Sequence, residues 1–264
     1  MFYICSHRQS RYRPAKQHLS GHAPGRPSQG GQEGEQGISG LSEGFFAFFA
    51  ELAQNNDRAW FTANKDRYRA EVLSPLSDFV AAMGPRLGKI SPHYVADPRP
   101  NGGSIFRIYR DLRFAKGGKP YKEHGACHFR HEAGKDAHAP GYYVHLEPDQ
   151  VMFGAGIWKP PSPELRKIRE AIAGHQADWK TVIADKRLKA AYGGVSGDGL
   201  TRPPRGFDAD HPHIEDIKRQ TFFVIRRAEP ALAARPDFPD EVAKTFRAAT
   251  PLMRFLTKAV GAPF

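Results

Sequence analysis

GYYVHLEPDQVMFGAGIW, residues 141–158, decides the expected fold, because it contains two apolar-rich segments joined by a short polar turn. Val144 and Leu146 alternate with more polar residues in the first segment, as in a strand that turns one face toward a core. The turn sequence PDQ, residues 148–150, is typical of a connection between paired strands. We therefore predict an antiparallel hairpin whose second strand lies within residues 150–158.

Three further segments have the length and composition of strands: residues 103–114, 123–132 and 221–228. Apolar residues at helical spacing precede the strands between Leu41 and Gly88, and they return after Ser162. The order of helices, strands and helices favours an α+β fold over a doubly wound sheet. We predict a single domain, mainly an antiparallel sheet with N-terminal helices and C-terminal helices packed on it.

Polar and proline residues mark the expected breaks within the helical regions. The sequence NND at 55–57 ends one helix and supplies a cap for the next. Gly84-Pro85 weakens a later helix near its end. Pro251 predicts a kink in the closing helix.

The first forty residues differ in composition from the rest of the chain. They are rich in Gly, Ser, Gln, His and Arg, and they lack periodic apolar residues. Such a segment cannot bury enough apolar surface to offset the entropy of ordering it. We predict a disordered basic tail over residues 1–40 and a single folded domain over residues 41–264.

The charge and cysteine content narrow the class of partner and the compartment. The formal net charge of +11 favours phosphate-bearing ligands or nucleic acid. No apolar run approaches the roughly 20 residues that cross a bilayer, so no membrane partner is expected. The two cysteines, Cys5 and Cys127, fit a reducing compartment, and we expect a cytoplasmic protein. Oligomeric state has no signal in the sequence.

A basic stretch, FRIYRDLRFAKGGKPYK at 106–122, has a cation at every third residue. Gly117 and Gly118 would let the backbone approach a ligand closely. We predict that this Gly-Lys loop and its flanks bind a phosphate-bearing ligand, with Tyr109 and Tyr143 as further donors. The predicted cationic ligand-binding residues are Arg107, Arg110, Arg113, Lys116, Lys119 and Lys122.

Pairing of the segment from 103 with the segment from 141 would create one polar sheet face. The side chains expected on it are Arg107, Tyr109, Asp111, Tyr143, His145 and Glu147. Phe106 and Ile108 are expected on the opposite side, in the core. As catalytic candidates, His145 would serve as a base, oriented by Glu147 or Asp111.

Three functions remain open on this evidence. The first is binding of a nucleotide or nucleic acid through the basic sheet face. The second is a small-molecule hydrolase or transferase that acts on an anionic substrate. The third is a protein-interaction module without a pocket. A purely structural interpretation also remains open, in which Arg107 or Arg110 pairs with Asp111 or Glu147 to join strands.

No motif indicates a cofactor, and we expect no metal site. His124, Cys127, His128 and His131 are close in sequence. In a strand, however, His124 and His128 would lie about 13 Å apart at roughly 3.3 Å per residue, too far to share one ion. The loop RPPRGFDADHPH, residues 202–213, is expected to be a rigid surface loop rather than a lid.

Several motifs resemble, in the same order, a widespread bacterial and fungal family that is catalogued as a conserved domain of unknown function. They are NNDRAWFTANKDRY, FRIYRDLRF…PYK, GYYVHLEP, GAGIWKP and PPRGFDADHP. The resemblance extends from about Leu41 to the C-terminus. It implies one domain, and it implies no activity, cofactor or catalytic residue. The family loop reads Phe-Ser-Lys-Asp-Lys-Thr-Pro-Tyr-Lys, whereas this chain has Gly117 and Gly118 in place of the acid and a lysine, so a role for that acid is not carried over.

Overall fold

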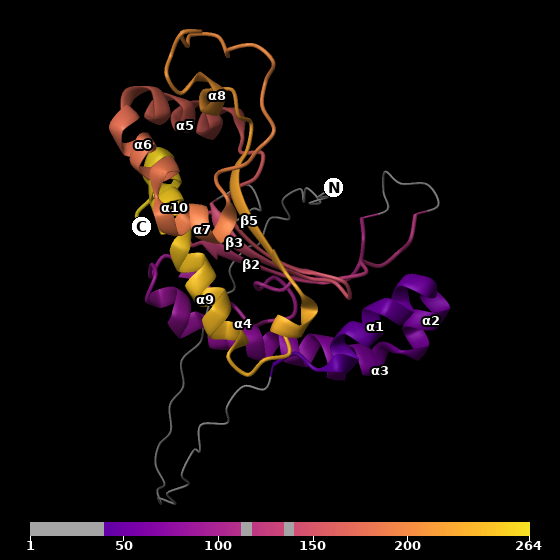
Figure 1. Ribbon diagram of the computed structural model, residues 1–264. Coiled ribbons are helices and arrows are strands. Elements are labelled where there is room, and N and C mark those ends of the chain that lie inside the picture. The colour runs from indigo at the N-terminus through magenta and orange to yellow at the C-terminus, as the bar shows by residue number, and fades with distance from the viewer. Residues whose placement is uncertain (1–39, 112–117, 135–139) are drawn as a thin grey trace, which may run out of the picture. The chain divides into compact units, whose positions relative to one another are not determined.

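An antiparallel sheet organises the protein, and each of its strands pairs with the next strand in the chain (Figure 1). The computed structural model describes residues 40–111, 118–134 and 140–264. The predicted tail therefore lies outside the described residues, apart from Gly40. In the described part, the sheet has five strands in the order β1-β2-β3-β4-β5. They are β1 (Tyr94–Val95), β2 (Gly125–His131), β3 (Gly141–Leu146), β4 (Val151–Ile157) and β5 (Phe222–Ala228).

The two faces of the sheet differ in chemistry. On the core face, Cys127 of β2 lies opposite Val144 of β3, which lies opposite Phe153 of β4, and all three are fully buried. On the other side, here called the second face, His128 lies opposite Tyr143. The predicted hairpin between β3 and β4 is confirmed, with the Glu147 N–H donating to the Gln150 carbonyl across its turn.

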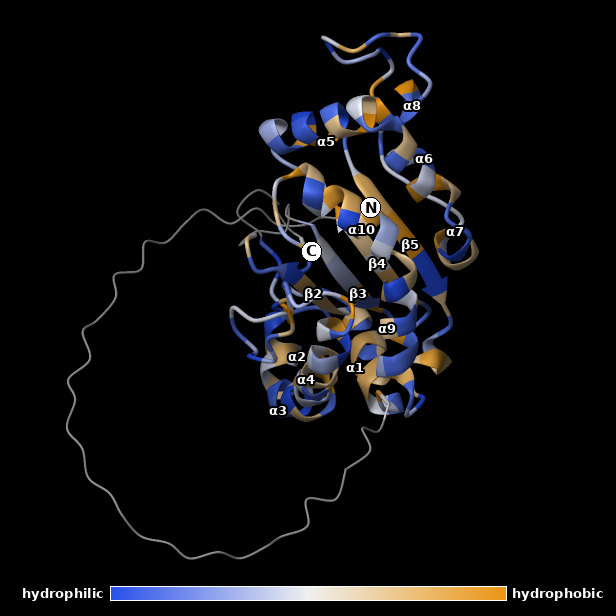
Figure 2. Cartoon of the chain, turned by 90° about the vertical axis from the view of Figure 1, so that its left-hand side faces the viewer, coloured by the Kyte–Doolittle hydropathy of each residue, from blue (hydrophilic) through white to orange (hydrophobic). Residues whose placement is uncertain are grey.

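Helices from both ends of the chain cover the core face. They are α4 (Ser74–Gly88), α9 (Phe238–Ala248) and α10 (Thr250–Ala259). Phe79 of α4 stacks on Phe238 of α9, and Phe246 of α9 stacks on Tyr142 of β3. In Figure 2, β4 and β5 are hydrophobic along much of their length. The predicted α+β architecture is thereby confirmed.

The N-terminal helices form a nearly continuous series before the sheet. They are α1 (Glu43–Gln54), α2 (Arg58–Ala63), α3 (Lys65–Tyr68) and a π-helical segment (Arg69–Leu73) that runs into α4. As predicted, residues 55–57 separate two helices, and the Asp57 carboxylate accepts from the Trp60 N–H at 2.9 Å. Pro85 lies within α4, which continues to Gly88.

The connection from β4 to β5 contains α5 (Ser162–Gly174), α6 (Gln176–Ala184), α7 (Lys186–Tyr192) and α8 (Ile214–Ile217). The loop at 202–213 leads through α8 to the start of β5, which pairs with the end of β4. It thus lies at the opposite end of the strands from Leu146. A 3-10 turn, Pro230–Leu232, follows β5. The expected kink near Pro251 is a helix break at Ala249, so Pro251 lies in the first turn of α10.

Residues 103–111, the described part of the strand predicted at 103–114, do not form a regular strand. Among its described residues, only Ile105 and Tyr109 form isolated bridges, to Cys127 and Tyr121. Between these two bridges, the three residues 106–108 face the five residues 122–126, and the resulting bulge changes the alternation of side chains. β1 was not predicted. No helix in the described ranges combines the length and the apolar character that crossing a bilayer requires.

Candidate functional site

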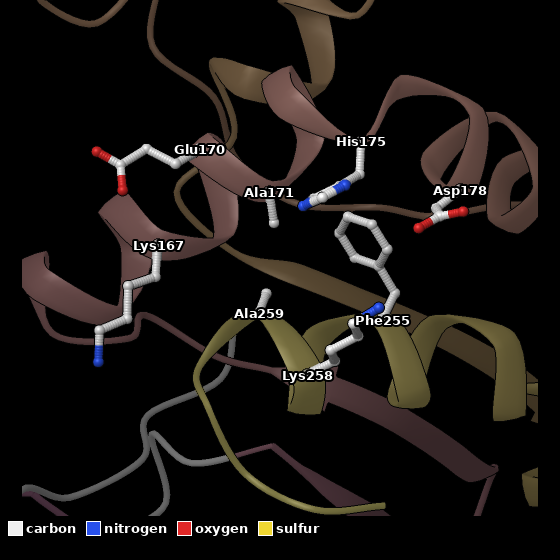
Figure 3. A pocket seen from close by; sticks show the side chains of 8 residues that line it. All are labelled: Lys167, Glu170, Ala171, His175, Asp178, Phe255, Lys258 and Ala259. Atoms are coloured by element: carbon white, nitrogen blue, oxygen red, sulfur yellow. The ribbon is translucent and has the colours of Figure 1, made fainter.

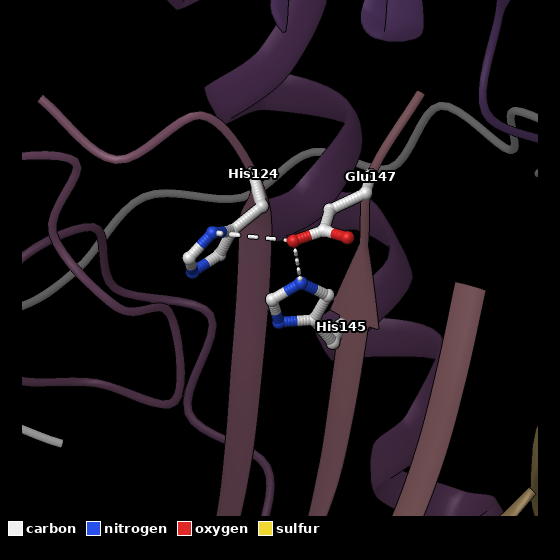
Figure 4. Close-up of side chains that lie close together, drawn as sticks. All are labelled: His124, His145 and Glu147. Atoms are coloured by element: carbon white, nitrogen blue, oxygen red, sulfur yellow. Dashed lines mark ion pairs between the residues drawn. The ribbon is translucent and has the colours of Figure 1, made fainter. Parts of the chain in front are cut away.

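Two histidines and a glutamate meet where β2 begins and β3 ends (Figure 4). His145 of β3 lies opposite Ala126 of β2, and Leu146 lies opposite Gly125. The same register, continued by one residue, sets His124 opposite Glu147. The residues at i and i+2 share a sheet face, so His124, His145 and Glu147 all reach the second face. We call these three residues the His-His-Glu cluster.

The cluster is tight and only partly covered. The His145 Nε2 atom lies 2.7 Å from Glu147 Oε1, and the His124 Nδ1 atom lies 4.0 Å from the same oxygen. The two imidazole rings lie 4.1 Å apart between centroids, with 32° between their planes. The His145 side chain is only 6% exposed, whereas those of His124 and Glu147 are 23% and 30% exposed. His124 and Glu147 therefore face the solvent, and His145 lies beneath them.

Two neighbours hold the parts of the cluster that point away from its centre. The hydroxyl of Tyr143 lies 2.9 Å from His145 Nδ1. The side-chain amide of Gln150 donates to Glu147 Oε2 at 3.2 Å. Burial raises the pKa of the Tyr143 hydroxyl, so it remains protonated and donates to Nδ1 of a neutral imidazole. In that arrangement, the proton of His145 is on Nε2, toward Glu147.

Burial keeps both histidines neutral near pH 7. The pKa of His124 is lowered to about 3, mainly by desolvation and also by its proximity to His145 and to the positive charges of Lys122 and Arg110. Desolvation also lowers the pKa of His145, although the hydrogen bond and the charge of Glu147 oppose this shift. Each imidazole therefore retains an unprotonated ring nitrogen at neutral pH.

The contacts of His145 change its expected role. Both of its ring nitrogens are within hydrogen-bond distance of protein groups, one at Tyr143 and the other at Glu147. A substrate proton could reach the ring only after one of these contacts broke. The geometry therefore fits His145 as a positioning residue for Glu147, and the solvent-facing groups His124 and Glu147 are better placed to touch a ligand.

The lysines of the basic stretch have partners inside the protein. The Lys119 ammonium lies 2.8 Å from Glu123 and donates to the Ala53 carbonyl at the end of α1. The Lys122 ammonium donates to the Arg107 carbonyl at 2.8 Å and lies 5.2 Å from the centre of the Phe106 ring. Lys119 thus joins the segment before β2 to α1, a contact that was not predicted, while Lys122 stays on the side of His124.

The remaining ligand-binding and catalytic candidates are dispersed. Tyr109 is 49% exposed and packs its ring against Phe61 of α2 rather than beside Tyr143. Arg107 and Arg110 are exposed. Asp111, the last described residue before the gap at 112–117, is half-buried. Two further candidates lie outside the described residues: Arg113 and Lys116.

The bulge also reverses the expected orientation of Phe106. Its ring lies parallel to that of His128, with 6.0 Å between centroids, and meets Tyr143 edge-on. Phe106 therefore belongs to the second face, contrary to the prediction that it lies in the core. Ile108 is 4% exposed and is in the core as expected.

A cavity of about 330 Å³ lies between α5, α6 and α10, away from the His-His-Glu cluster (Figure 3). Phe255 forms part of its wall. The charged lining includes Lys167 and Lys258 but also Glu170 and Asp178, so the two signs of charge balance. This lining selects neither an anion nor a cation, and we assign it no function.

His124 is the member of the cluster that sequence reasoning missed. In the sequence its nearest candidate partner among the histidines is His128, four residues away, whereas its partners in the structure belong to the end of the next strand. The signal that could have found it is the alternation of His145 and Glu147 combined with the strand register. A loop of nine residues, 132–140, joins β2 to β3, and its length alone does not fix that register.

Comparison with known proteins places the chain in a family. A family model described as conserved hypothetical protein (DUF2461) matches residues 44–255. The chain belongs to this family. The DUF2461 match includes every strand of the sheet and the whole His-His-Glu cluster, and it confirms the predicted membership in a conserved domain of unknown function. A search of curated proteins finds no match. The description of DUF2461 names no activity, so the chemistry of the site is the basis for a function.

Proposed function

We propose that the protein is a hydrolase or transferase for a small anionic, phosphate-bearing substrate, and that the reaction takes place at the His-His-Glu cluster. The observation that carries this proposal is the convergence of His124 and Glu147 at a partly exposed position, over a buried His145. Groups that can accept a proton and also contact solvent are what an acid–base site requires.

Glu147 is the proposed general base. Its Oε1 atom is held by His145 and its Oε2 atom by Gln150, so the carboxylate has a fixed position. In hydrolysis it would take a proton from water as the water oxygen bonds to the phosphorus or acyl carbon. The bond to the leaving oxygen then breaks, and Glu147 returns the proton to that oxygen. In a transferase, a substrate hydroxyl replaces the water.

Positive charge near His124 supports an anionic substrate. The charges of Lys122 and Arg110 both act on His124. Arg110 is exposed and is available to a ligand, whereas Lys122 already donates to a backbone carbonyl. We propose that Arg110, together with the charge of Lys122, attracts the phosphate group.

The test is turnover of a panel of aryl phosphate mono- and diesters, aryl acetates and nucleoside triphosphates. We expect E147Q to lower kcat about 100-fold or more, since positioned bases contribute roughly 10²–10⁴. R110A should raise KM more than it lowers kcat. E132Q, which alters a second His-Glu pair at His93, is the matched control and should keep full activity.

Two other results would replace the proposal. Tight binding of nucleotides or polynucleotides without turnover, weakened by salt and by R110A, would favour the phosphate-binding alternative. If the protein neither turns over nor binds any member of the panel, both the enzyme proposal and the phosphate-binding alternative are overturned, and an interaction module is favoured.

A further inference from the structure

We infer that His124, His145 and Glu147 bind a divalent first-row transition ion of the zinc class. The inference rests on the proposed function only for its location, because it uses the same cluster. It requires no particular reaction. Two imidazoles and one carboxylate are a ligand set that Zn²⁺ accepts, with a fourth position left for water or substrate.

The distances suit one ion. One ligand atom from each residue can be chosen so that all three lie within 4.8 Å of one another. Metal bonds of about 2.0–2.2 Å place the ligand atoms of a tetrahedral site roughly 3.4 Å apart. The separations from Glu147 Oε1, 2.7 Å to His145 and 4.0 Å to His124, lie on either side of that value. Small rotations of exposed side chains would bring His124 and Glu147 into range.

Two of the atoms that would not touch the ion already have partners of the kind that orient metal ligands. Tyr143 lies at Nδ1 of His145, and Gln150 donates to Oε2 of Glu147. With an ion on Nε2, the proton of His145 would move to Nδ1 and be donated to the Tyr143 hydroxyl oxygen. Such outer contacts fix the tautomer and orientation of a ligand.

Exposure and charge determine what kind of site this is. His145 is enclosed, but His124 and Glu147 keep one side open to solvent. Glu147 supplies one negative charge, while Lys122 and Arg110 add positive charge nearby. The loaded site would therefore be strongly cationic, and its open position would favour an anionic ligand. This agrees with the phosphate-bearing substrate class proposed above.

The experiment titrates the chelator-treated full-length protein with ZnCl₂ by calorimetry, and with CoCl₂ while recording visible absorption. We expect one ion per chain with a Kd below about 10 µM, and Co²⁺ bands typical of low coordination number. H124Q and E147Q should each weaken Zn²⁺ binding at least 100-fold. Y143F should weaken it by about 10–100-fold, because it removes only the outer contact.

E132Q is the matched control. Glu132 pairs with His93 at 2.6 Å, so it offers another His-Glu pair in the same protein. Circular dichroism and thermal unfolding without metal show whether each variant is folded, and both H124Q and E147Q change side chains that are only partly covered. Any of three results overturns the inference. They are unchanged Zn²⁺ affinity in both H124Q and E147Q, loss of Zn²⁺ binding in E132Q, and no stoichiometric Zn²⁺ binding to the wild type.

The outcomes separate metal binding from the proposed reaction. Turnover that resists chelators and is lost in E147Q would overturn the metal site and leave the acid–base proposal in place. Stoichiometric Zn²⁺ binding without turnover of any substrate would support the metal site and count against the proposed reaction.

Discussion

Acidification should destabilise the fold through His128, which is buried on the second face of the sheet. Its side chain is 7% exposed, in ring contact with Phe106. The pKa of His128 is lowered to about 3, mainly by burial and also by the neighbouring charge of Arg130. In the unfolded chain, the same imidazole has a pKa of about 6.5.

The sign and size of the effect follow from proton linkage. Because the folded pKa is the lower one, the unfolded state binds the proton first as pH falls. The loss of stability begins below about pH 6.5 and is complete near pH 3. At pH 5 the free energy of unfolding falls by about 2 kcal/mol, since each of the roughly 1.5 units below 6.5 is worth about 1.36 kcal/mol.

Urea unfolding of the wild type and H128Q at several pH values between 7.5 and 5 measures this contribution. H128Q is expected to lose stability at pH 7.5 through altered packing, so the informative quantity is how the difference between the two proteins changes with pH. The difference should shrink by about 2 kcal/mol on going to pH 5. Other histidines are present in both proteins, and their contributions cancel.

H175Q, at an exposed position, controls for the substitution itself. If the free energies of unfolding of the wild type and H128Q run parallel across this pH range, His128 is not buried as a neutral imidazole. The account of the second face would then be wrong.

Two further predictions concern backbone contacts. Asn56 makes three hydrogen bonds to the segment before β2, two of them with the backbone of Tyr121. N56A should lower the free energy of unfolding by about 2–3 kcal/mol in urea, whereas N55A, at an exposed helix end, should cost less than about 1 kcal/mol; equal costs would contradict this role. Gly156 has φ of +140°, and a Cβ there would lie 2.1 Å from the Phe222 carbonyl oxygen. G156A should therefore cost more than about 2 kcal/mol or prevent folding, and a Tm within 2 °C of wild type would refute the close approach of β4 and β5.

The architecture could be predicted because its signals are local. The alternation in residues 141–158 and the short turn between the two strands specify β3, β4 and their pairing without reference to the rest of the chain. Helical spacing likewise located α1, α4 and α9. β1 is two residues long and gives no periodic signal.

The orientation of residues 105–111 could not be predicted, because tertiary contacts set it. Asn56 holds the segment before β2 through the backbone of Tyr121, and Lys119 joins the same segment to the end of α1. These contacts accompany a bulge, so strict alternation fails there. The expected grouping of Tyr109 with Tyr143 depended on that alternation, whereas the grouping of Tyr143, His145 and Glu147 needed only one strand.

The order in which the strands pair has a consequence for synthesis on the ribosome. β2, β3 and β4 are consecutive, but the chain must continue through three longer helices before β5 exists. Until then, the β4 backbone is an unpaired edge, and its segment VMFGAGI has no charged residue to discourage association with another chain. Nascent molecules that stop or are cleaved between residues 158 and 221 would therefore aggregate readily, which makes rapid arrival of β5 a requirement for good yield.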